Sequence, residues 1–148
     1  MIGDAQAARA LPPGGTLGKT RHAPVTRVEI AWYMVASYDR NPIHVDEPFA
    51  RSAGLPSVVG QGMIPLGYLA SRLVEEVGHR RLRGLGGDFI GSVLPDEELV
   101  TEIVLEGATE REDGVELRWK LVAENGIGEP RLRGWARSFH ENSDAVRG

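Results

Sequence analysis

The spacing of apolar residues predicts two helices in the first third of the chain. Thr26 followed three residues later by Glu29 is the pattern of a capping box, and the strongly apolar run that follows predicts a helix ending near Tyr38. Asp46 can cap a second, short helix, and Gly54 is placed to terminate it in the left-handed conformation. The segment between the two helices contains a proline, which prevents the first helix from continuing.

A third helical segment is apolar around nearly its whole circumference. It runs from Gly62 to Val74, and Arg72 is its only charged residue. A helix without a polar face has no side to present to water. The sequence therefore predicts a buried central helix.

Beyond the central helix the apolar period changes to two, the period of β strands. The apolar faces of the first two such segments are Leu99, Thr101, Ile103 and Leu105, and, after a turn at residues 112–114, Val115, Leu117, Trp119, Leu121 and Ala123. Residues 82–94 and 131–140 predict two further strands, and residues 16–25 predict a weaker first strand ended by Pro24. An antiparallel sheet wrapped around the central helix is the economical way to cover it, so we expect an α+β domain.

The length and composition fit one domain. The chain has 148 residues, of which 41% are hydrophobic, which suffices for one core. We expect this domain to span residues 16–141. The Ala-rich opening with its Pro-Pro-Gly-Gly sequence predicts a flexible N-terminal arm over residues 1–15, and residues 142–148 predict a frayed C-terminus.

The charge balance argues against polyanionic partners. Lys and Arg total 17 against 21 for Asp and Glu, a net charge of −4, so we expect neither nucleic acid nor a membrane surface as a partner. The apolar runs are too short to cross a bilayer, and the chain has no cysteine. The N-terminus resembles no secretion signal, and we therefore expect a cytoplasmic protein.

The clearest candidate chemistry lies between the predicted helices. Asp39 and His44 are five residues apart in a segment that Pro42 holds extended or turned, so their side chains can converge on one cleft. Gly60 and Gly62 stand at the start of the buried helix, where free backbone N–H groups can receive a carbonyl oxygen. Adding water to an α,β-unsaturated thioester needs a base, an acid and donors for the enolate-like oxygen, and these residues supply all three.

Plainer interpretations stay open for each of these residues. Asp39 can cap a turn, His44 can be a structural histidine, and the two glycines can be turn residues. Asp39, His44 and Asp46 are close enough in sequence for a metal site, but the chain has no His-x-x-x-His spacing, and we expect no metal. None of the serines near the histidine stands in a Gly-x-Ser-x-Gly elbow, which disfavours an ordinary hydrolase; they are Ser37, Ser52 and Ser57.

The remaining histidines and the tryptophans have structural interpretations. We expect three histidines at the surface: His22, His79 and His140. Trp32 and Trp119 fall on apolar faces and predict core packing. Trp135 lies between two arginines, facing either solvent or a subunit partner.

The segment Tyr38–His44, followed by Ala50 and then by Gly60–Met63, closely resembles the signature of the MaoC-like, (R)-specific enoyl-CoA hydratases. The resemblance covers roughly residues 16–140. It implies the hot-dog fold, in which an antiparallel β-sheet is wrapped around a long central helix. It also implies that Asp39 and His44 are the catalytic pair.

The same resemblance assigns substrate-binding roles around the pair. Asn41 is expected to orient the site, and Gly62 to donate its backbone N–H to the thioester carbonyl. The family usually has glycine before the aspartate and histidine before the helix glycine, where this chain has Tyr38 and Gln61. We therefore expect these two residues, with the neighbouring Met63, to alter the wall of the cleft.

The resemblance implies a partner as well as a reaction. Proteins of this kind are typically dimers with the thioester arm at the subunit interface, so we expect a homodimer, or a heteromer with a related chain. The substrate would be an acyl thioester of coenzyme A or acyl carrier protein, with no cofactor. The leading hypothesis is a hydro-lyase; the alternatives are a hot-dog thioesterase and a non-catalytic partner subunit.

Overall fold

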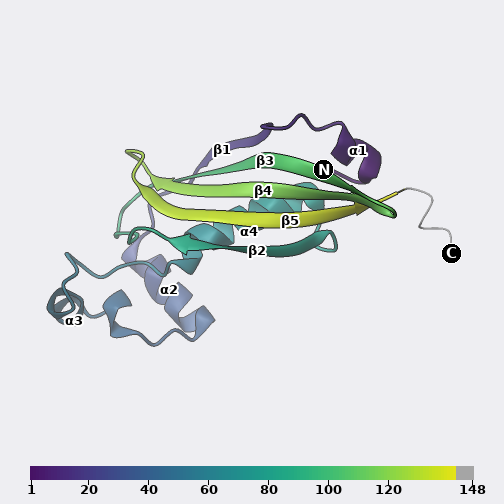
Figure 1. Ribbon diagram of the computed structural model, residues 1–148. Helices are drawn as coiled ribbons and strands as arrows, with labels where there is room; N and C mark the ends of the chain where they lie inside the picture. Colours follow the sequence, from purple (N-terminus) through teal and green to yellow (C-terminus); the bar gives the residue numbers. More distant parts are fainter. Residues whose placement is uncertain (143–148) are drawn as a thin grey trace.

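The computed structural model describes residues 1–142 as a curved sheet wrapped around one long helix (Figure 1). The predicted frayed C-terminus lies, apart from residue 142, outside the described residues. The elements in chain order are α1 (Ala5–Arg9), β1 (Thr16–Arg21), α2 (Arg27–Ser37), the 3₁₀ helix η1 (Pro42–His44), α3 (Glu47–Ser52), α4 (Met63–Val77), β2 (Leu82–Phe89), β3 (Leu99–Arg111), β4 (Gly114–Asn125) and β5 (Pro130–Glu141).

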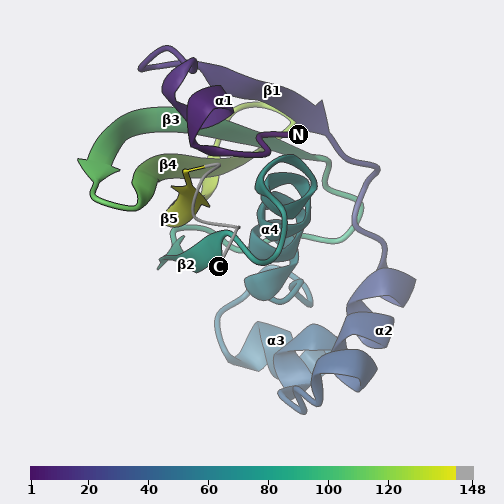
Figure 2. The same ribbon diagram turned by 90° about the vertical axis from the view of Figure 1, so that its right-hand side faces the viewer.

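The five strands form one antiparallel sheet in the order β1-β3-β4-β5-β2. The sheet curves around α4 (Figure 2). The alternating apolar positions of β3 and β4 are buried, and most of them share one core cluster with α4. Leu69 and Leu73 of α4 pack in the same core cluster as Trp119 and Leu121 of β4. The predicted α+β hot-dog fold is confirmed.

Two strands are shorter than their sequence patterns predicted. The strand expected over residues 16–25 ends at Arg21, and the one expected over 82–94 ends at Phe89. β2 ends at Phe89. The chain after it is joined to the segment before α4 by an isolated antiparallel bridge, in which the Gly60 N–H donates to the Val93 carbonyl at 2.8 Å. The segment after β2 thus becomes a wall beside the start of α4.

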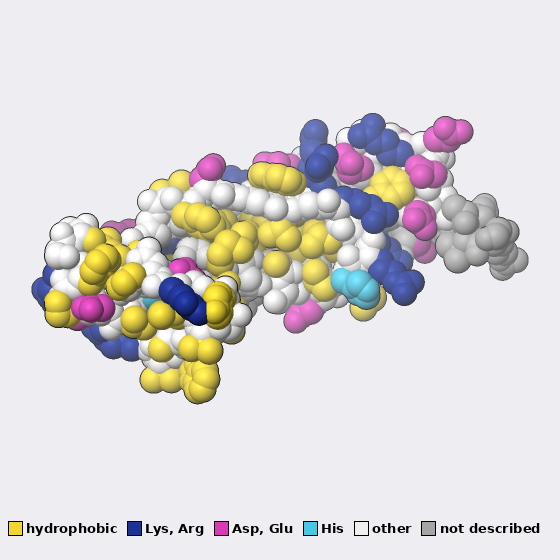
Figure 3. Space-filling model, turned by 90° about the horizontal axis from the view of Figure 1, so that it is seen from below, with side chains coloured by type: hydrophobic (Ala, Val, Ile, Leu, Met, Phe, Trp, Pro, Cys, Tyr) yellow, Lys and Arg dark blue, Asp and Glu magenta, His cyan; other side chains and the backbone are white. Residues whose placement is uncertain are grey.

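The central helix is buried on one side rather than all round. Its core-facing side includes Leu66, Leu69 and Leu73, whereas Met63 is half-exposed and Gly67 has open space beside it. The sheet wraps only half of the helix, because β2 forms a free edge in the sheet order. Seen from below, hydrophobic side chains gather on this face of the molecule (Figure 3).

The expected flexible arm at residues 1–15 is wrong for its first part. Asp4 caps α1 by accepting a hydrogen bond from the Ala7 N–H at 2.9 Å. Ile2, Ala5 and Ala8 are buried in the main core cluster. The small alanine side chains let α1 lie close against β4 and β5, so the Ala-rich composition serves packing rather than flexibility.

The two helices before α4 begin and end as their caps predicted. The capping box of Thr26 and Glu29 is present, and Tyr38 ends α2 in the left-handed conformation with φ 60°. Asp46 accepts from the Phe49 N–H at 3.0 Å to cap α3. Both helices lie at one end of the molecule, near the start of α4 (Figure 2).

The tryptophans differ in their surroundings. Trp119 is buried as predicted, and its indole N–H donates to the Ser138 hydroxyl at 2.9 Å. The prediction for Trp32 is wrong: it is 69% exposed, because α2 turns Ile30 inward and leaves Trp32 on the outer side. Trp135 is half-exposed on the sheet.

The predicted surface position of one histidine is also wrong. His79 is exposed, and His22 is partly buried and stacks on the Tyr68 ring with centroids 4.1 Å apart. His140, expected at the surface, is fully buried, with its Nε2 3.0 Å from the Ser138 hydroxyl. The alternation along β5 places His140 on the same inward face as Ala136.

Among residues 1–142, no helix is both long and apolar enough to cross a membrane.

The burial of His140 predicts a pH-dependent stability. Burial, with help from the positive charge of Arg81, lowers the pKa of His140 to about 4 from its ordinary 6.5. Between these pH values the unfolded chain binds a proton that the folded chain does not, so the free energy of unfolding should fall as pH decreases from 6.5 to 4. The slope due to this one group is at most about 1.4 kcal/mol per pH unit.

Urea unfolding at several pH values measures this effect. His140→Gln should lack this component and show a shallower loss of stability over the same pH range, whereas the matched control His79→Gln should follow the wild type. Equal slopes for the wild type and His140→Gln would contradict the assignment.

Candidate active site

Two consecutive turns bring Asp39 and His44 together. The left-handed backbone of Tyr38 ends α2 and starts the loop. Asp39 Oδ1 accepts from the Asn41 N–H at 3.1 Å, and Asn41 Oδ1 accepts from the Ile43 N–H at 3.2 Å, which caps η1. Asx turns of this kind are compact, so the chain reverses within five residues.

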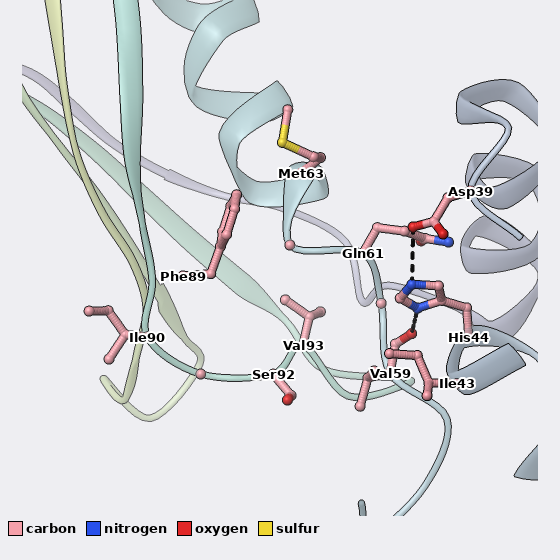
Figure 4. A pocket seen from close by; sticks show the side chains of 13 residues that line it. Asp39, Ile43, His44, Val59, Gln61, Met63, Phe89, Ile90, Ser92 and Val93 are labelled. Carbon is pink, nitrogen blue, oxygen red and sulfur yellow. Dashed lines mark hydrogen bonds and ion pairs between the residues drawn. The ribbon is translucent and has the colours of Figure 1, made fainter. Parts of the chain in front are cut away.

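The resulting pair is fixed at both nitrogens of the imidazole (Figure 4). His44 Nε2 lies 3.2 Å from Asp39 Oδ2, and His44 Nδ1 lies 2.6 Å from the Val59 carbonyl oxygen. Because a carbonyl only accepts, Nδ1 carries a proton and Nε2 is directed toward the carboxylate. The His44 side chain is 7% exposed and the Asp39 side chain 41%, so the carboxylate is the more solvent-exposed member of the pair. This arrangement suits proton transfer to and from a bound molecule.

The pair opens onto a cavity of about 350 Å³ between the start of α4 and the segment after β2. Its lining residues come from three parts of the chain: Asp39, Ile43 and His44; Val59, Gly60, Gln61, Gly62 and Met63; and Phe89, Ile90, Gly91, Ser92 and Val93. In Figure 4 the first and third groups lie on opposite sides of the second. The cavity therefore joins the Asp39–His44 pair to the N-terminal end of α4.

Gly62 is the N-cap of α4 and has no side chain with which to cap it. The first N–H groups of a helix carry partial positive charge and point out of its end. A Cβ at residue 62 would come within 2.9 Å of the Phe89 ring. Glycine thus keeps the positive end of α4 open while allowing Phe89 to close against it.

Gln61 fastens the start of α4 to α2. It is 3% exposed, and its Nε2 donates to the Ile30 carbonyl oxygen at 3.3 Å. The Oε1 atom is buried and has no hydrogen-bond partner among the described residues. The amide orientation follows from the Ile30 contact, because only the nitrogen can donate to a carbonyl.

Two residues expected to bind substrate do not line the cavity. Tyr38 is exposed, and its ring lies beneath the Arg40 guanidinium at 4.2 Å, because the left-handed turn directs it outward. Asn41 uses its side-chain oxygen to cap η1. Gln61 and Met63 do line the cavity, as expected.

The wall formed by residues 89–93 was missed by the sequence reasoning. They fall in the last part of the strand predicted over residues 82–94, where side chains would alternate rather than face one cleft. Gly91 and Ser92 were the available signal for a break. A Cβ at residue 91 would meet the Pro130 carbonyl oxygen at 2.8 Å, so the chain passes there only as glycine.

The described residues contain no cluster of three or more histidine or acidic side chains arranged for a metal ion. Asp46, which the sequence places near Asp39 and His44 as a possible third metal ligand, uses its carboxylate to cap α3. The expectations of no metal and no cofactor stay predictions.

Comparisons with known sequences identify the family. A protein-family model described as MaoC like domain matches residues 8–125. Over 74 residues the chain is 35% identical to the peroxisomal enoyl-CoA hydratase 2 of Arabidopsis thaliana, which covers 48% of this chain and 24% of that protein. The chain spans between 4% and 24% of the length of the curated relatives that it matches.

Solved structures share the fold. The (R)-hydratase from A. caviae involved in PHA biosynthesis superposes with a TM-score of 0.76 at 18% identity, covering 88% of this chain and 97% of that chain. A chain of the ChsH1-ChsH2 complex from Mycobacterium tuberculosis superposes with a TM-score of 0.75 at 12% identity, covering 88% and 98%. The family model spans more than half of the chain, and the protein therefore belongs to the MaoC-like dehydratase family.

Proposed function

We propose that this protein is a hydro-lyase that adds water to a trans-2-enoyl thioester, or removes it from a 3-hydroxyacyl thioester, carried on coenzyme A or acyl carrier protein. The observation that carries the proposal is the Asp39–His44 pair, 3.2 Å apart, in one cavity with the start of α4. The hydratase names of its relatives support the same class of reaction.

In the hydration direction, the pair takes a proton from water as the water oxygen bonds to the β-carbon. The π electrons move toward the thioester, and negative charge develops on its carbonyl oxygen. The Gly62 N–H, at the positive end of α4, stabilises that charge. A proton returned from the pair to the α-carbon completes the addition, so H and OH are both accounted for.

We propose further that the active form is a homodimer. A helix whose surface is largely apolar needs cover on all sides, and α4 leaves Met63, Gly67, Ala70 and Val74 on an open side. These residues share one stripe by their spacing of four and three. A second copy related by a two-fold axis would cover this stripe and pair with the free edge of β2.

Substitution of the pair tests the reaction. Asp39→Asn and His44→Ala should each lower turnover of crotonyl-CoA roughly 100-fold to 10,000-fold, because proton transfer contributes that much. His79→Ala, an exposed histidine away from the cavity, should be unchanged. Loss of the enoyl absorbance measures hydration, and a thiol reagent follows any release of free coenzyme A.

Wild-type turnover in either variant would refute the assignment. Thiol release without hydration would instead identify a thioesterase. Activity that appears only after a second, related chain is added would favour a heteromeric enzyme.

The contact between Gly62 and Phe89 predicts a coupling energy in a double-mutant cycle. Gly62→Ala should destabilise the wild type by about 1–3 kcal/mol, because the new Cβ overpacks against the ring. In a Phe89→Ala background the same change should cost less, because the truncated side chain leaves room for the new Cβ. Chemical denaturation of the four proteins measures the coupling, and an equal cost in both backgrounds would contradict this role of glycine.

The dimer predicts a mass of twice the 16.1 kDa chain. Ala70→Glu combined with Val74→Glu should shift the protein to monomer, because two carboxylates cannot be buried unpaired at the interface. Light scattering after size exclusion measures the mass. A wild type that is monomeric at micromolar concentration, or a double variant that stays dimeric, would contradict the arrangement.

A further inference from the structure

An arginine cluster lies at the far end of β2 from the Asp39–His44 pair. Arg80, Arg81 and Arg83 line a cavity of about 390 Å³ together with Phe139. In the view from below, Lys and Arg side chains gather at one end of the apolar face (Figure 3). The sequence reasoning considered only the net charge of −4 and missed this local concentration of positive charge.

Within the part of the chain that the structure describes, no ion pair neutralises the positive charge of the cluster. No carboxylate within residues 1–142 forms a salt bridge with any of the three guanidinium groups, whereas other arginines, such as Arg72 and Arg131, do have such partners. Asp4 and Glu141 line the same cavity, and Asp4 caps α1. Arg80 and Arg83 are exposed and therefore available to a ligand.

Within one chain the cluster stands well away from the active-site cavity. It adjoins the first residue of β2, while Phe89 at the last residue of β2 lines the cavity. The eight residues of the strand span roughly 25 Å. In an antiparallel pairing in which two β2 edges overlap along their whole length, however, the first residue of one strand lies beside the last residue of the other. The cluster of one copy would then border the cavity of its partner.

We propose that Arg80, Arg81 and Arg83 bind the phosphate groups of the thioester carrier whose acyl end occupies the partner's cavity. This inference rests on the proposed function and dimer. Guanidinium groups bind phosphate oxygens through paired, charge-assisted hydrogen bonds. Three guanidinium groups without ion-pair partners among residues 1–142, which would border the partner's cavity in the proposed dimer, match a ligand with a polyanionic head and a neutral arm. Coenzyme A, with its three phosphates, has this chemistry.

Binding of non-reacting thioesters tests the cluster directly. Butyryl-CoA, butyryl-4′-phosphopantetheine and butyryl-pantetheine share the acyl-pantetheine arm. They carry three, one and no phosphate groups, and butyryl-CoA alone carries the adenosine. Arg80→Gln with Arg83→Gln should weaken butyryl-CoA binding about tenfold or more in calorimetry, and leave butyryl-pantetheine unchanged. Arg81 is kept, because its Nη1 donates to the Val77 carbonyl oxygen at the end of α4.

The matched control removes the same charge elsewhere. Lys19→Gln with Arg21→Gln takes two positive charges from β1, at the opposite edge of the sheet, and should bind butyryl-CoA like the wild type. A loss for phosphopantetheine equal to that for coenzyme A would locate the contact at the phosphate shared with acyl carrier protein. A loss confined to coenzyme A would locate it at the nucleotide.

The outcomes separate the cluster from the reaction. Two results would overturn the phosphate-binding role of the arginines. One is a wild type that binds butyryl-CoA no more tightly than butyryl-pantetheine, and the other is an arginine variant that binds butyryl-CoA like the wild type. If the arginine variant loses affinity for butyryl-CoA alone while the wild type does not hydrate crotonyl-CoA, the proposed reaction is refuted. The proposed phosphate-binding role of the arginines is then retained. The monomeric Ala70→Glu, Val74→Glu protein should bind butyryl-CoA as weakly as the arginine variant; wild-type affinity there would overturn binding across the interface.

Discussion

The structure depends on the packing of one apolar helix in the curve of one sheet. Leu69 and Leu73 of α4 meet Trp119 and Leu121 of β4, and this contact forms the centre of the main core cluster. The start of α4 lines one cavity with Asp39 and His44, which the segment after α2 and the 3₁₀ helix η1 carry. The position of the candidate pair is therefore tied to the position of the helix.

Much of the fold could be predicted from local patterns, because the patterns and the packing agree. The period of two in residues 99–105 and 115–123 specifies strands whose inward positions are those found buried. The caps at Thr26 and Asp46 specify where helices begin. Each of these signals depends on neighbouring residues alone, and tertiary contacts did not override it.

The errors share a different physical cause. The Ala-rich residues 5–9 have no long side chains to reveal a core position, yet small residues are what a helix needs to approach a sheet closely. Trp32 lies in an apolar run, but only the direction of α2 relative to α4 decides which side of that run is covered. His140 occupies an inward position in the alternation of β5, but a histidine is polar and was therefore expected at the surface. Such facts depend on distant contacts, which a sequence pattern does not contain.

The convergence of the candidate pair was predictable from the sequence, and the boundaries of its cavity were less so. The spacing of Asp39 and His44 around Pro42 favoured convergence, and the structure has them 3.2 Å apart. The opposite wall, residues 89–93, depends on where β2 leaves the sheet, which the sequence pattern placed too late.

The run before α4 is fastened on two sides, by hydrogen bonds from the Gly60 N–H to the Val93 carbonyl and from the Val59 N–H to the Ile43 carbonyl. Both walls of the cavity are thereby joined to the same short stretch of backbone before any ligand arrives. A site of this kind has little conformational freedom left to lose on binding. Its selectivity among ligands must then come from the shape and polarity of fixed walls, and enlarging the cavity would require a change of side chains rather than a movement of loops.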